Sequence, residues 1–219
     1  MNNTGCEILL ERHGQSIGNE KRVYLGHTDL DLSALGYEQA ELCATALLGE
    51  RIDAIYASDL LRAYNTAVPH ARLRGMEITA REDLREIYAG DWENMLFEDI
   101  KSRFPEIYFG CWREHFASFS GAGESGESVP HLAERIYSAV VDIARKNLGK
   151  RVLIATHAAA IRALWGKLSG LSPDEASLAF DFPTNASITR VDFDGERLVP
   201  ICYSDDSHLG SSADKLRNP

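Results

Sequence analysis

Short apolar runs alternate with longer amphipathic stretches along this chain, and the alternation constrains its fold more than any other feature. The apolar runs are Cys6–Glu11, Ile52–Ala57, Met76–Ala80 and Arg151–Thr156. The amphipathic stretches run from Ser33 to Gly49, from about Leu60 to Leu73, from about Pro130 to Leu148 and from His157 to Leu168. Strands that alternate with helices form mainly parallel sheets. We therefore predict an α/β fold, with a mainly parallel central sheet and helices on both faces.

The ends of these segments carry recognisable signals. Ser33 is expected to cap the helix that follows it, and Ser58 with Asp59 is expected to cap the next one. Gln15–Leu32 shows no clear periodicity, which indicates a long ordered loop. Near the end of the chain, Ser187–Phe193 and Leu198–Tyr203 predict a hairpin that closes across the turn between them.

The chain shows neither an internal repeat nor a convincing linker, so residues 1–210 are expected to form a single domain. Segment 94–129 is expected to form an insertion over the active site. It should be helical between Leu96 and Phe116, except at Phe104–Pro105, because the residue before a proline is disfavoured in a helix. A glycine-rich hinge, Gly121–Ser128, ends this insertion. Residues 211–219 are polar and are expected to form a flexible tail.

The charge balance excludes several kinds of partner. Thirty-three acidic residues against 23 basic ones give a formal net charge of −10. A chain with this charge does not hold nucleic acid or an anionic membrane through its overall field. An anionic substrate would therefore need a local pocket built from a few arginines.

Cysteine usage and hydropathy indicate the compartment. The four cysteines, Cys6, Cys43, Cys111 and Cys202, form neither a C-x-x-C pair nor a short metal-binding pattern. The first residues lack the basic and apolar regions of a secretory signal, and no apolar run approaches the length of about 20 residues of a membrane span. We expect a cytoplasmic protein with reduced thiols. It would be a monomer or a homodimer, and the sequence does not choose between these states.

Polar residues follow the predicted strands where each strand ends. Arg12 and His13 come directly after the first run, Arg62 lies just after the second, and His157 follows the fourth. Glu86 comes shortly after the third run. Because the carboxyl ends of parallel strands meet at one rim, these side chains are expected to lie together at a ligand site.

The motifs that hold these residues match a known family in order and spacing. They are RHGQS at 12–16, GHTDLDLSALG at 26–36, SDLLRA at 58–63, REIYAGDWE at 85–93, GES at 126–128, THAAAIRAL at 156–164 and NASITRVDF at 185–193. Together they cover nearly the whole chain, which resembles the histidine phosphatase superfamily in its phosphoglycerate-mutase-like branch.

The resemblance implies a phosphohistidine mechanism. His13 would attack phosphorus, Glu86 would act as acid and then as base, and Arg12, Arg62 and His157 would hold the phosphoryl oxygens. The resemblance further places five residues at the substrate: Asn19, Gln15, Ser16, His27 and Thr28. Among these, Asn19 would donate a hydrogen bond, and His27 would chiefly order its loop.

Physical chemistry supports these roles independently. Arginine donates to two phosphate oxygens at once and keeps its proton. A nucleophilic imidazole must be neutral, which His13 can be near pH 7, whereas His157 is most useful protonated beside a phosphate anion that raises its pKa. No metal ion or other cofactor is required, because the arginines and His157 supply the positive charge.

Simpler interpretations exist for each residue. An Arg-His pair at a strand end is often a surface or capping feature, and Asp91 or Glu93 could take the place of Glu86. Ser58 could orient His157. The remaining histidines, His70, His115, His131 and His208, are interpreted as structural.

Two positions depart from the family pattern. Ala158 and Ala159 stand where glycines often follow the second histidine, which narrows the pocket slightly but keeps the backbone N–H donors. Glu11 stands where an apolar residue is usual, and strand alternation directs it away from Arg12. It either pairs with a base on the opposite face or carries a raised pKa.

The preferred function is a metal-independent phosphomonoesterase that acts on a small phosphorylated metabolite. The alternatives are a cofactor-dependent phosphoglycerate mutase, a non-catalytic module that binds a phospholigand, and a zinc hydrolase. A mutase needs extra basic residues over the site, and segment 94–129 offers only three: Lys101, Arg103 and Arg113. The aromatic residues of the insertion indicate a substrate with an organic body: Trp92, Phe97, Phe104, Tyr108, Phe109, Trp112 and Phe116.

Overall fold

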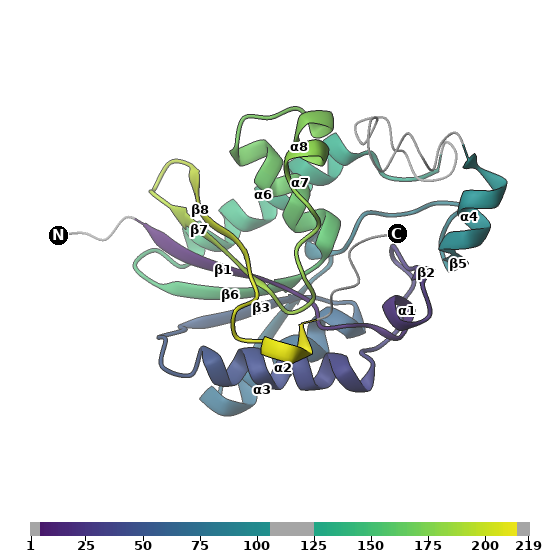
Figure 1. Ribbon diagram of the computed structural model, residues 1–219. Helices are drawn as coiled ribbons and strands as arrows, with labels where there is room; N and C mark the ends of the chain where they lie inside the picture. Colours follow the sequence, from purple (N-terminus) through teal and green to yellow (C-terminus); the bar gives the residue numbers. More distant parts are fainter. Residues whose placement is uncertain (1–4, 106–124, 214–219) are drawn as a thin grey trace.

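Six strands hydrogen-bond into one sheet in the order β4-β3-β6-β1-β7-β8 (Figure 1). The computed structural model describes residues 5–105 and 125–213. The strands are β1 (Cys6–Arg12), β3 (Ala54–Ser58), β4 (Ile78–Arg81), β6 (Arg151–Thr156), β7 (Ile188–Phe193) and β8 (Leu198–Asp205). The first four of these run parallel, and β7 and β8 run antiparallel at one edge. The predicted α/β fold with a mainly parallel sheet is confirmed, and β7 and β8 form the expected closing hairpin.

Helices cover both faces of this sheet, as the alternation predicts. On one face lie α2 (Ala34–Ala46) and α3 (Leu61–Arg74), and on the other α6 (Val129–Lys146) and α7 (Ala158–Leu168), with α8 (Pro173–Ala179) against α7 (Figure 1). Successive side chains of β1 point to opposite faces of the sheet and therefore pack against the two helical layers in turn. Ile8 and Leu10 pack with α6 and α7, whereas Leu9 packs with α2 and α3. Glu11 shares the face of Leu9.

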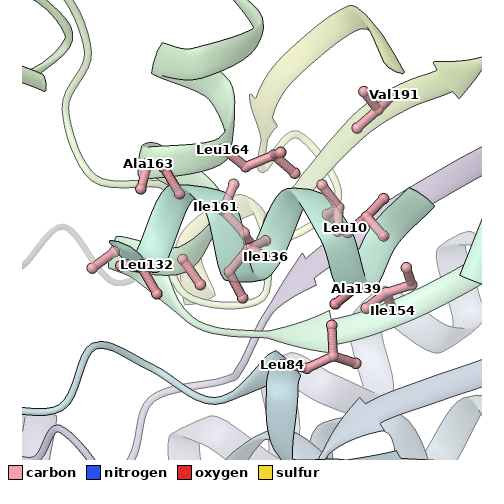
Figure 2. Packing of buried hydrophobic residues seen from close by; sticks show 14 of the residues in the cluster. Leu10, Leu84, Leu132, Ile136, Ala139, Ile154, Ile161, Ala163, Leu164 and Val191 are labelled. Atoms are coloured by element: carbon pink, nitrogen blue, oxygen red, sulfur yellow. The ribbon is translucent and has the colours of Figure 1, made fainter. Parts of the chain in front are cut away.

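Helix α6 begins where Ser128 accepts a hydrogen bond from the backbone N–H of His131. Its buried residues recur every three or four positions, which gives a continuous apolar stripe. Figure 2 shows Leu132, Ile136 and Ala139 of this stripe beside Ile161 and Leu164 of α7. Each fully buried leucine or isoleucine contributes about 1.5–3 kcal/mol. The helix thus fixes α7, whose first turn lies at the site described below.

The start of α3 differs from the expectation. Leu60 is the N-cap residue and makes no side-chain capping bond. The backbone N–H of Leu61 donates instead to Oδ1 of Asp29 at 2.7 Å. Asp59 pairs with Arg85, so the prediction that Ser58 and Asp59 cap this helix is wrong. The cap comes from a loop 32 residues earlier in the chain, which local sequence does not reveal.

The stretch 15–32, expected to be a loop throughout, contains two short elements. They are α1 (Ile17–Glu20) and β2 (Val23–Tyr24), and β2 pairs with β5 (Met95–Leu96). This second, two-stranded sheet lies apart from the main sheet, with α1 and α4 (Phe97–Arg103) nearby (Figure 1). Such short elements have too few residues for a periodic pattern to indicate them.

The predicted insertion is described only at its two ends. Helix α4 ends at Arg103, immediately before Phe104–Pro105, as expected. Residues 106–124 lie outside the described part. This range includes the first residues of the expected hinge and most of the aromatic residues of the insertion. The placement of the insertion over the active site therefore stays a prediction.

The last described residues pack against the domain. We expected a flexible tail from residue 211, but Gly210–Ser212 form a short 3-10 helix. The carbonyl oxygen of Ser212 accepts a hydrogen bond from Nε2 of buried Gln39 at 2.8 Å. Another 3-10 helix, Glu82–Leu84, follows β4. Throughout residues 5–105 and 125–213, no helix combines the length and the apolar composition that a membrane crossing requires.

Candidate active site

The chain leaves the sheet at the end of β1 through a tightly fixed backbone. The backbone N–H of Arg12 donates to Ser187, and that of His13 donates to Thr156 at 2.9 Å. Gly14 then donates to Oγ1 of Thr66 in α3. A Cβ atom at Gly14 would lie only 2.4 Å from the backbone oxygen of Gly36, so no larger residue fits without movement. These contacts place His13 rigidly at the carboxyl-end rim.

The His13 ring is held in one tautomer. Its Nδ1 lies 2.7 Å from the carbonyl oxygen of Gly14, and because a carbonyl oxygen only accepts, Nδ1 carries the hydrogen. The lone pair is therefore on Nε2. Burial and the charges of Arg62 and Arg12 hold the pKa of His13 well below its usual range. The ring is thus a neutral base near pH 7, as expected for a nucleophile.

The ring of His157 stands edge-on to that of His13, with the ring centroids 5.2 Å apart. His157 is fully buried at the N-cap position of α7. Burial and the charge of Arg62 hold its pKa well below the usual range. Without a bound anion this direction is opposite to the one expected for a protonated His157. In the structure as described, His157 is therefore a neutral ring at neutral pH.

Two arginines supply positive charge beside these rings. Arg62 is 1% exposed and donates to the carbonyl oxygens of Gly26 (2.7 Å) and Thr28 (2.9 Å). Burial lowers the pKa of Arg62 to about 10, so the guanidinium stays charged at neutral pH. Arg12 donates to the carbonyl oxygen of Pro183. The expected local cationic pocket is present despite the negative net charge.

The Glu86 carboxylate lies at the first turn of α7. Its Oε1 accepts hydrogen bonds from the backbone N–H groups of Ile87 and Ala160, and its Oε2 accepts one from Ala159 at 3.1 Å. The alanine that replaces a usual glycine keeps its N–H donor, as expected, but donates it to Glu86. The carboxylate is thereby fixed on the rim that carries both histidines.

Arg135 of α6 fixes the backbone around Glu86, and the sequence analysis missed it. Its guanidinium donates to the carbonyl oxygens of Asp83, Arg85 and Glu86 at 2.9–3.1 Å. Glu127, 9% exposed at its side chain, holds Arg135 in place by an ion pair. Glu127 belongs to the GES motif, so the motif could have indicated a structural partner for the segment around Glu86.

Glu93 organises the loop that faces Arg62, and this role was also missed. Its Oε1 accepts bonds from the backbone N–H groups of His27 and Ala89, and its Oε2 accepts bonds from the N–H and hydroxyl of Thr28. His27 in turn bonds through Nε2 to the carbonyl oxygen of Glu86. His27 therefore orders its loop, as expected. Glu93 is engaged in this loop and Asp91 is exposed, which leaves Glu86 as the carboxylate at the pocket.

The side chains of Gln15 and Ser16 hold the scaffold. Oε1 of Gln15 accepts the Ser33 hydroxyl, and Ser16 caps α1. Asn19 lies closer to the nucleophile, because its Oδ1 accepts bonds from the N–H of Ser16 and from Asn185, whose amide also donates to the carbonyl oxygen of His13. Since Oδ1 is occupied, the Nδ2 group of Asn19 is the part that can donate to a ligand.

A pocket opens over this cluster. Its polar lining is Arg12, His13, Asn19, Arg62 and Glu86, and its remaining lining is Val23, Tyr24, Leu25, Gly26, Ile87, Phe97, Ala158, Ala159 and Phe182. Five of the ten expected site residues thus line one pocket, and His157 contacts the ring of His13 beside it. Gln15, Ser16, His27 and Thr28 are not among the lining residues. Phe182 and Asn185, which sequence reasoning did not single out, come from the segment before β7.

Ser58 and Glu11 were also assigned possible roles. The hydroxyl of Ser58 accepts the backbone N–H of Leu60, and no contact to His157 accompanies it among the described residues. Glu11 pairs with His70, whose Nε2 lies 3.0 Å from Oε2 of Glu11. Of the two alternatives for Glu11, the structure shows the base on the opposite face, which is His70.

Known proteins resemble this chain over nearly its whole length. The model of the histidine phosphatase superfamily (branch 1) matches residues 8–206. Phosphoserine phosphatase 1 of Hydrogenobacter thermophilus is 31% identical, over 93% of this chain and 94% of that protein. A probable phosphoglycerate mutase of Photorhabdus laumondii is 32% identical, over 85% of each chain. The structure of a mycobacterial glucosyl-3-phosphoglycerate phosphatase superposes with a TM-score of 0.80 at 26% identity, over 92% of this chain and 100% of that one.

Proposed function

Since the chain belongs to the histidine phosphatase superfamily (branch 1), we propose that it is a phosphomonoesterase that hydrolyses a small phosphorylated metabolite through a phosphohistidine at His13. The single observation that carries the proposal is the fixed tautomer of this ring. Nδ1 donates to Gly14, so the lone pair of Nε2 is available in a pocket lined by Arg12 and Arg62. A neutral imidazole among guanidinium groups is suited to attack an anionic phosphoryl group.

In the first step, the Nε2 lone pair of His13 forms a bond to phosphorus, and the ester P–O bond breaks. The bonding pair leaves with the alkoxide, which takes a proton from the Glu86 carboxyl group. Arg12, Arg62 and the Nδ2 group of Asn19 donate to the phosphoryl oxygens, where the charge of the transition state is spread. The dianionic phosphoryl group favours a proton on His157, which then becomes a further donor.

In the second step, water attacks the phosphorus of the phosphohistidine. The Glu86 carboxylate takes the proton of that water, the P–N bond breaks, and its electron pair returns to Nε2 of His13. Inorganic phosphate leaves, and both residues are ready for another cycle. In this scheme Arg12, Arg62 and a protonated His157 supply the positive charge that stabilises the phosphoryl oxygens, so a metal ion has no part in turnover.

The lining of the pocket bears on the substrate. Val23, Tyr24, Leu25, Phe97 and Phe182 lie on the same pocket as the cationic cluster. Such a mixture suits a phosphate ester with an organic body, because apolar side chains gain free energy by covering it. A sugar phosphate, a nucleoside-like phosphate and a phosphoamino acid all meet this description. Two of the relatives named above are phosphatases, of phosphoserine and of glucosyl-3-phosphoglycerate, and the third is a probable phosphoglycerate mutase.

A panel assay tests the proposal. Phosphate release is measured with phosphoserine, glucosyl-3-phosphoglycerate and 3-phosphoglycerate, with and without a chelator, and interconversion of phosphoglycerates is followed in parallel. We expect phosphate release that survives the chelator. Interconversion without release would identify a mutase, and loss of turnover with the chelator would indicate zinc chemistry.

The variant His13→Ala separates an enzyme from a binding module. It is expected to lose phosphate release by about 10⁴-fold or more while still binding inorganic phosphate, because both arginines remain. In the unsubstituted protein, acid-labile label from a phosphorylated substrate is expected on His13. Unchanged turnover in His13→Ala would refute the proposed nucleophile.

We further propose that the protein works in the cytoplasm as a monomer or a homodimer. The three cysteines in the described residues are free, which suits a reducing compartment. Gel filtration with light scattering decides between the two oligomeric states. Localisation of a tagged full chain tests the compartment.

A further inference from the structure

Three side chains with metal-binding atoms meet on the sheet face opposite α6 and α7. They are Glu11 at the end of β1, Cys43 in α2 and His70 in α3, here named the buried triad. Each residue is fully buried, with 0% exposure. One carboxylate oxygen, the Cys43 sulfur and one His70 ring nitrogen all lie within 4.8 Å of one another.

The polar atoms of the buried triad face one another instead of the hydrogen-bond partners that burial normally requires. Among the described residues, neither ring nitrogen of His70 makes a hydrogen bond, and the Glu11 carboxylate has only the Cys43 thiol beside it as a donor. Nε2 of His70 and Oε2 of Glu11 are 3.0 Å apart, so they are close without the angles of a hydrogen bond. A buried carboxylate that lacks hydrogen bonds is costly unless another group compensates it.

From this cluster we propose that Glu11, Cys43 and His70 bind one zinc ion, at a structural site separate from the phosphate pocket. Thiolate, imidazole and carboxylate are all established zinc ligands. A zinc ion with a Cys43 thiolate, a Glu11 carboxylate and a neutral His70 has a net charge of zero. A neutral complex is the form that an apolar interior accepts most readily. If both oxygens of the Glu11 carboxylate bind, they complete a four-coordinate site together with the Cys43 sulfur and one His70 nitrogen.

The distances fit this assignment. Zinc bonds of about 2.0–2.2 Å to nitrogen and oxygen, at tetrahedral angles, place those ligand atoms about 3.3–3.6 Å apart. The observed 3.0 Å between His70 and Glu11 is within a few tenths of an ångström of this range. The Cys43 sulfur lies within 4.8 Å of both atoms, so rotation of its side chain has to bring it closer to an ion held between them.

The surroundings favour a structural ion over a catalytic one. Buried side chains of the sheet, α2 and α3 pack around Cys43, among them Leu9, Ala67 and Ile188. Burial, then the charge of Glu11, raises the pKa of the Cys43 thiol well above its usual range, so zinc must displace a proton to bind. Arg190 and Arg74 act on the thiol in the opposite direction. The metal would join β1, which leads directly into His13, to α3, which carries Arg62.

Sequence spacing could not reveal this site. The three residues are separated by 32 and 27 positions, and none of them lies in one of the family motifs. The inference rests on the geometry of the buried triad and not on the proposed phosphatase activity. Zinc content and phosphate release can therefore succeed or fail independently.

The test uses the full chain, because a fully buried site loads as the protein folds. The protein is expressed in medium supplemented with zinc, washed with a chelator and analysed for metal. We expect about one zinc per chain, almost none in Cys43→Ala or His70→Gln, and a melting temperature several degrees higher with zinc than without it. His13→Ala and Cys6→Ala are the matched controls. Both variants should keep their zinc, because His13 belongs to the phosphate pocket and Cys6 is a buried cysteine outside the triad.

A cobalt-grown protein gives a second readout, which reports the thiolate ligand directly and is first recorded on the unsubstituted protein. A thiolate ligand produces a sulfur-to-cobalt charge-transfer band, which should persist when Cys43 is the only cysteine left, after Cys6→Ser, Cys111→Ser and Cys202→Ser. Zinc well below one per chain in the unsubstituted protein, or no such band, would overturn the proposal. Undiminished zinc in folded Cys43→Ala would overturn it as well.

Discussion

The rings of His13 and His157 meet edge to face, and burial, followed by the charge of the same guanidinium, that of Arg62, lowers the pKa of both. A cation that disfavours protonation of two neighbouring imidazoles keeps one of them nucleophilic. It also prepares the other to become a donor once an anion offsets the field. The paired histidines therefore respond to the charge of the ligand.

The shared lowering of these two pKa values predicts a loss of stability in acid. The unfolded chain takes up protons at both histidines near pH 6.5, the ordinary value, whereas the folded chain does so only at lower pH. Below pH 6.5 the unfolded state binds more protons, so the free energy of unfolding falls, by up to about 1.4 kcal/mol per pH unit for each histidine. Melting temperatures at pH 7.5 and 5.5, without phosphate, measure the effect. His157→Gln should make the melting temperature less dependent on pH. Equal slopes in this variant and in the unsubstituted protein would contradict the prediction.

Glu86→Gln is expected to lower kcat/KM by about 10²–10⁴-fold for alkyl phosphates, because the leaving alkoxide no longer receives a proton. Aryl phosphates with stable leaving groups should be affected much less. Parallel assays with phosphoserine and p-nitrophenyl phosphate measure the difference. Asp91→Asn, at an exposed position nearby, is the control. An equal loss with both substrates would indicate that Glu86 only supports the fold.

Arg62→Lys keeps the charge but loses the planar fork that bonds to Gly26 and Thr28. We expect kcat/KM to fall about 10²-fold, since one ammonium cannot replace several fixed donors. Steady-state assays with the best substrate measure it. Arg72→Lys, on the exposed side of the same helix, should leave kcat/KM within about two-fold. Similar behaviour of both variants would show that charge alone suffices.

Glu93→Gln should loosen the loop at 26–28, because the carboxylate accepts four hydrogen bonds from it and from Ala89. The free energy of unfolding should fall by about 2–3 kcal/mol, and KM should rise. Urea unfolding and steady-state kinetics give the two quantities. Glu98→Gln, exposed in α4, is the matched control. A stable variant with unchanged KM would show that the loop holds its place without Glu93.

The sequence predicted the central cluster because a general rule brings it together. Arg12, His13, Arg62 and His157 follow parallel strands, and such strands end at one rim. Glu86 was predicted from the resemblance more than from geometry. The roles of Arg135 and Glu93 escaped prediction because they act mostly through backbone groups 49–66 positions away, which no local pattern encodes. The cap of α3 by Asp29 escaped for the same reason.

Strand β1 is hydrogen-bonded on both sides, to β6 and to β7. Its amide hydrogens, like those of the equally paired β6, can therefore exchange with solvent only when the whole domain opens, and their exchange should be among the slowest of the described residues. The short β2–β5 sheet has no such double support and should exchange orders of magnitude faster. Adaptation to different ligands is thus confined to the walls of the pocket, while its floor stays fixed for the lifetime of the folded molecule.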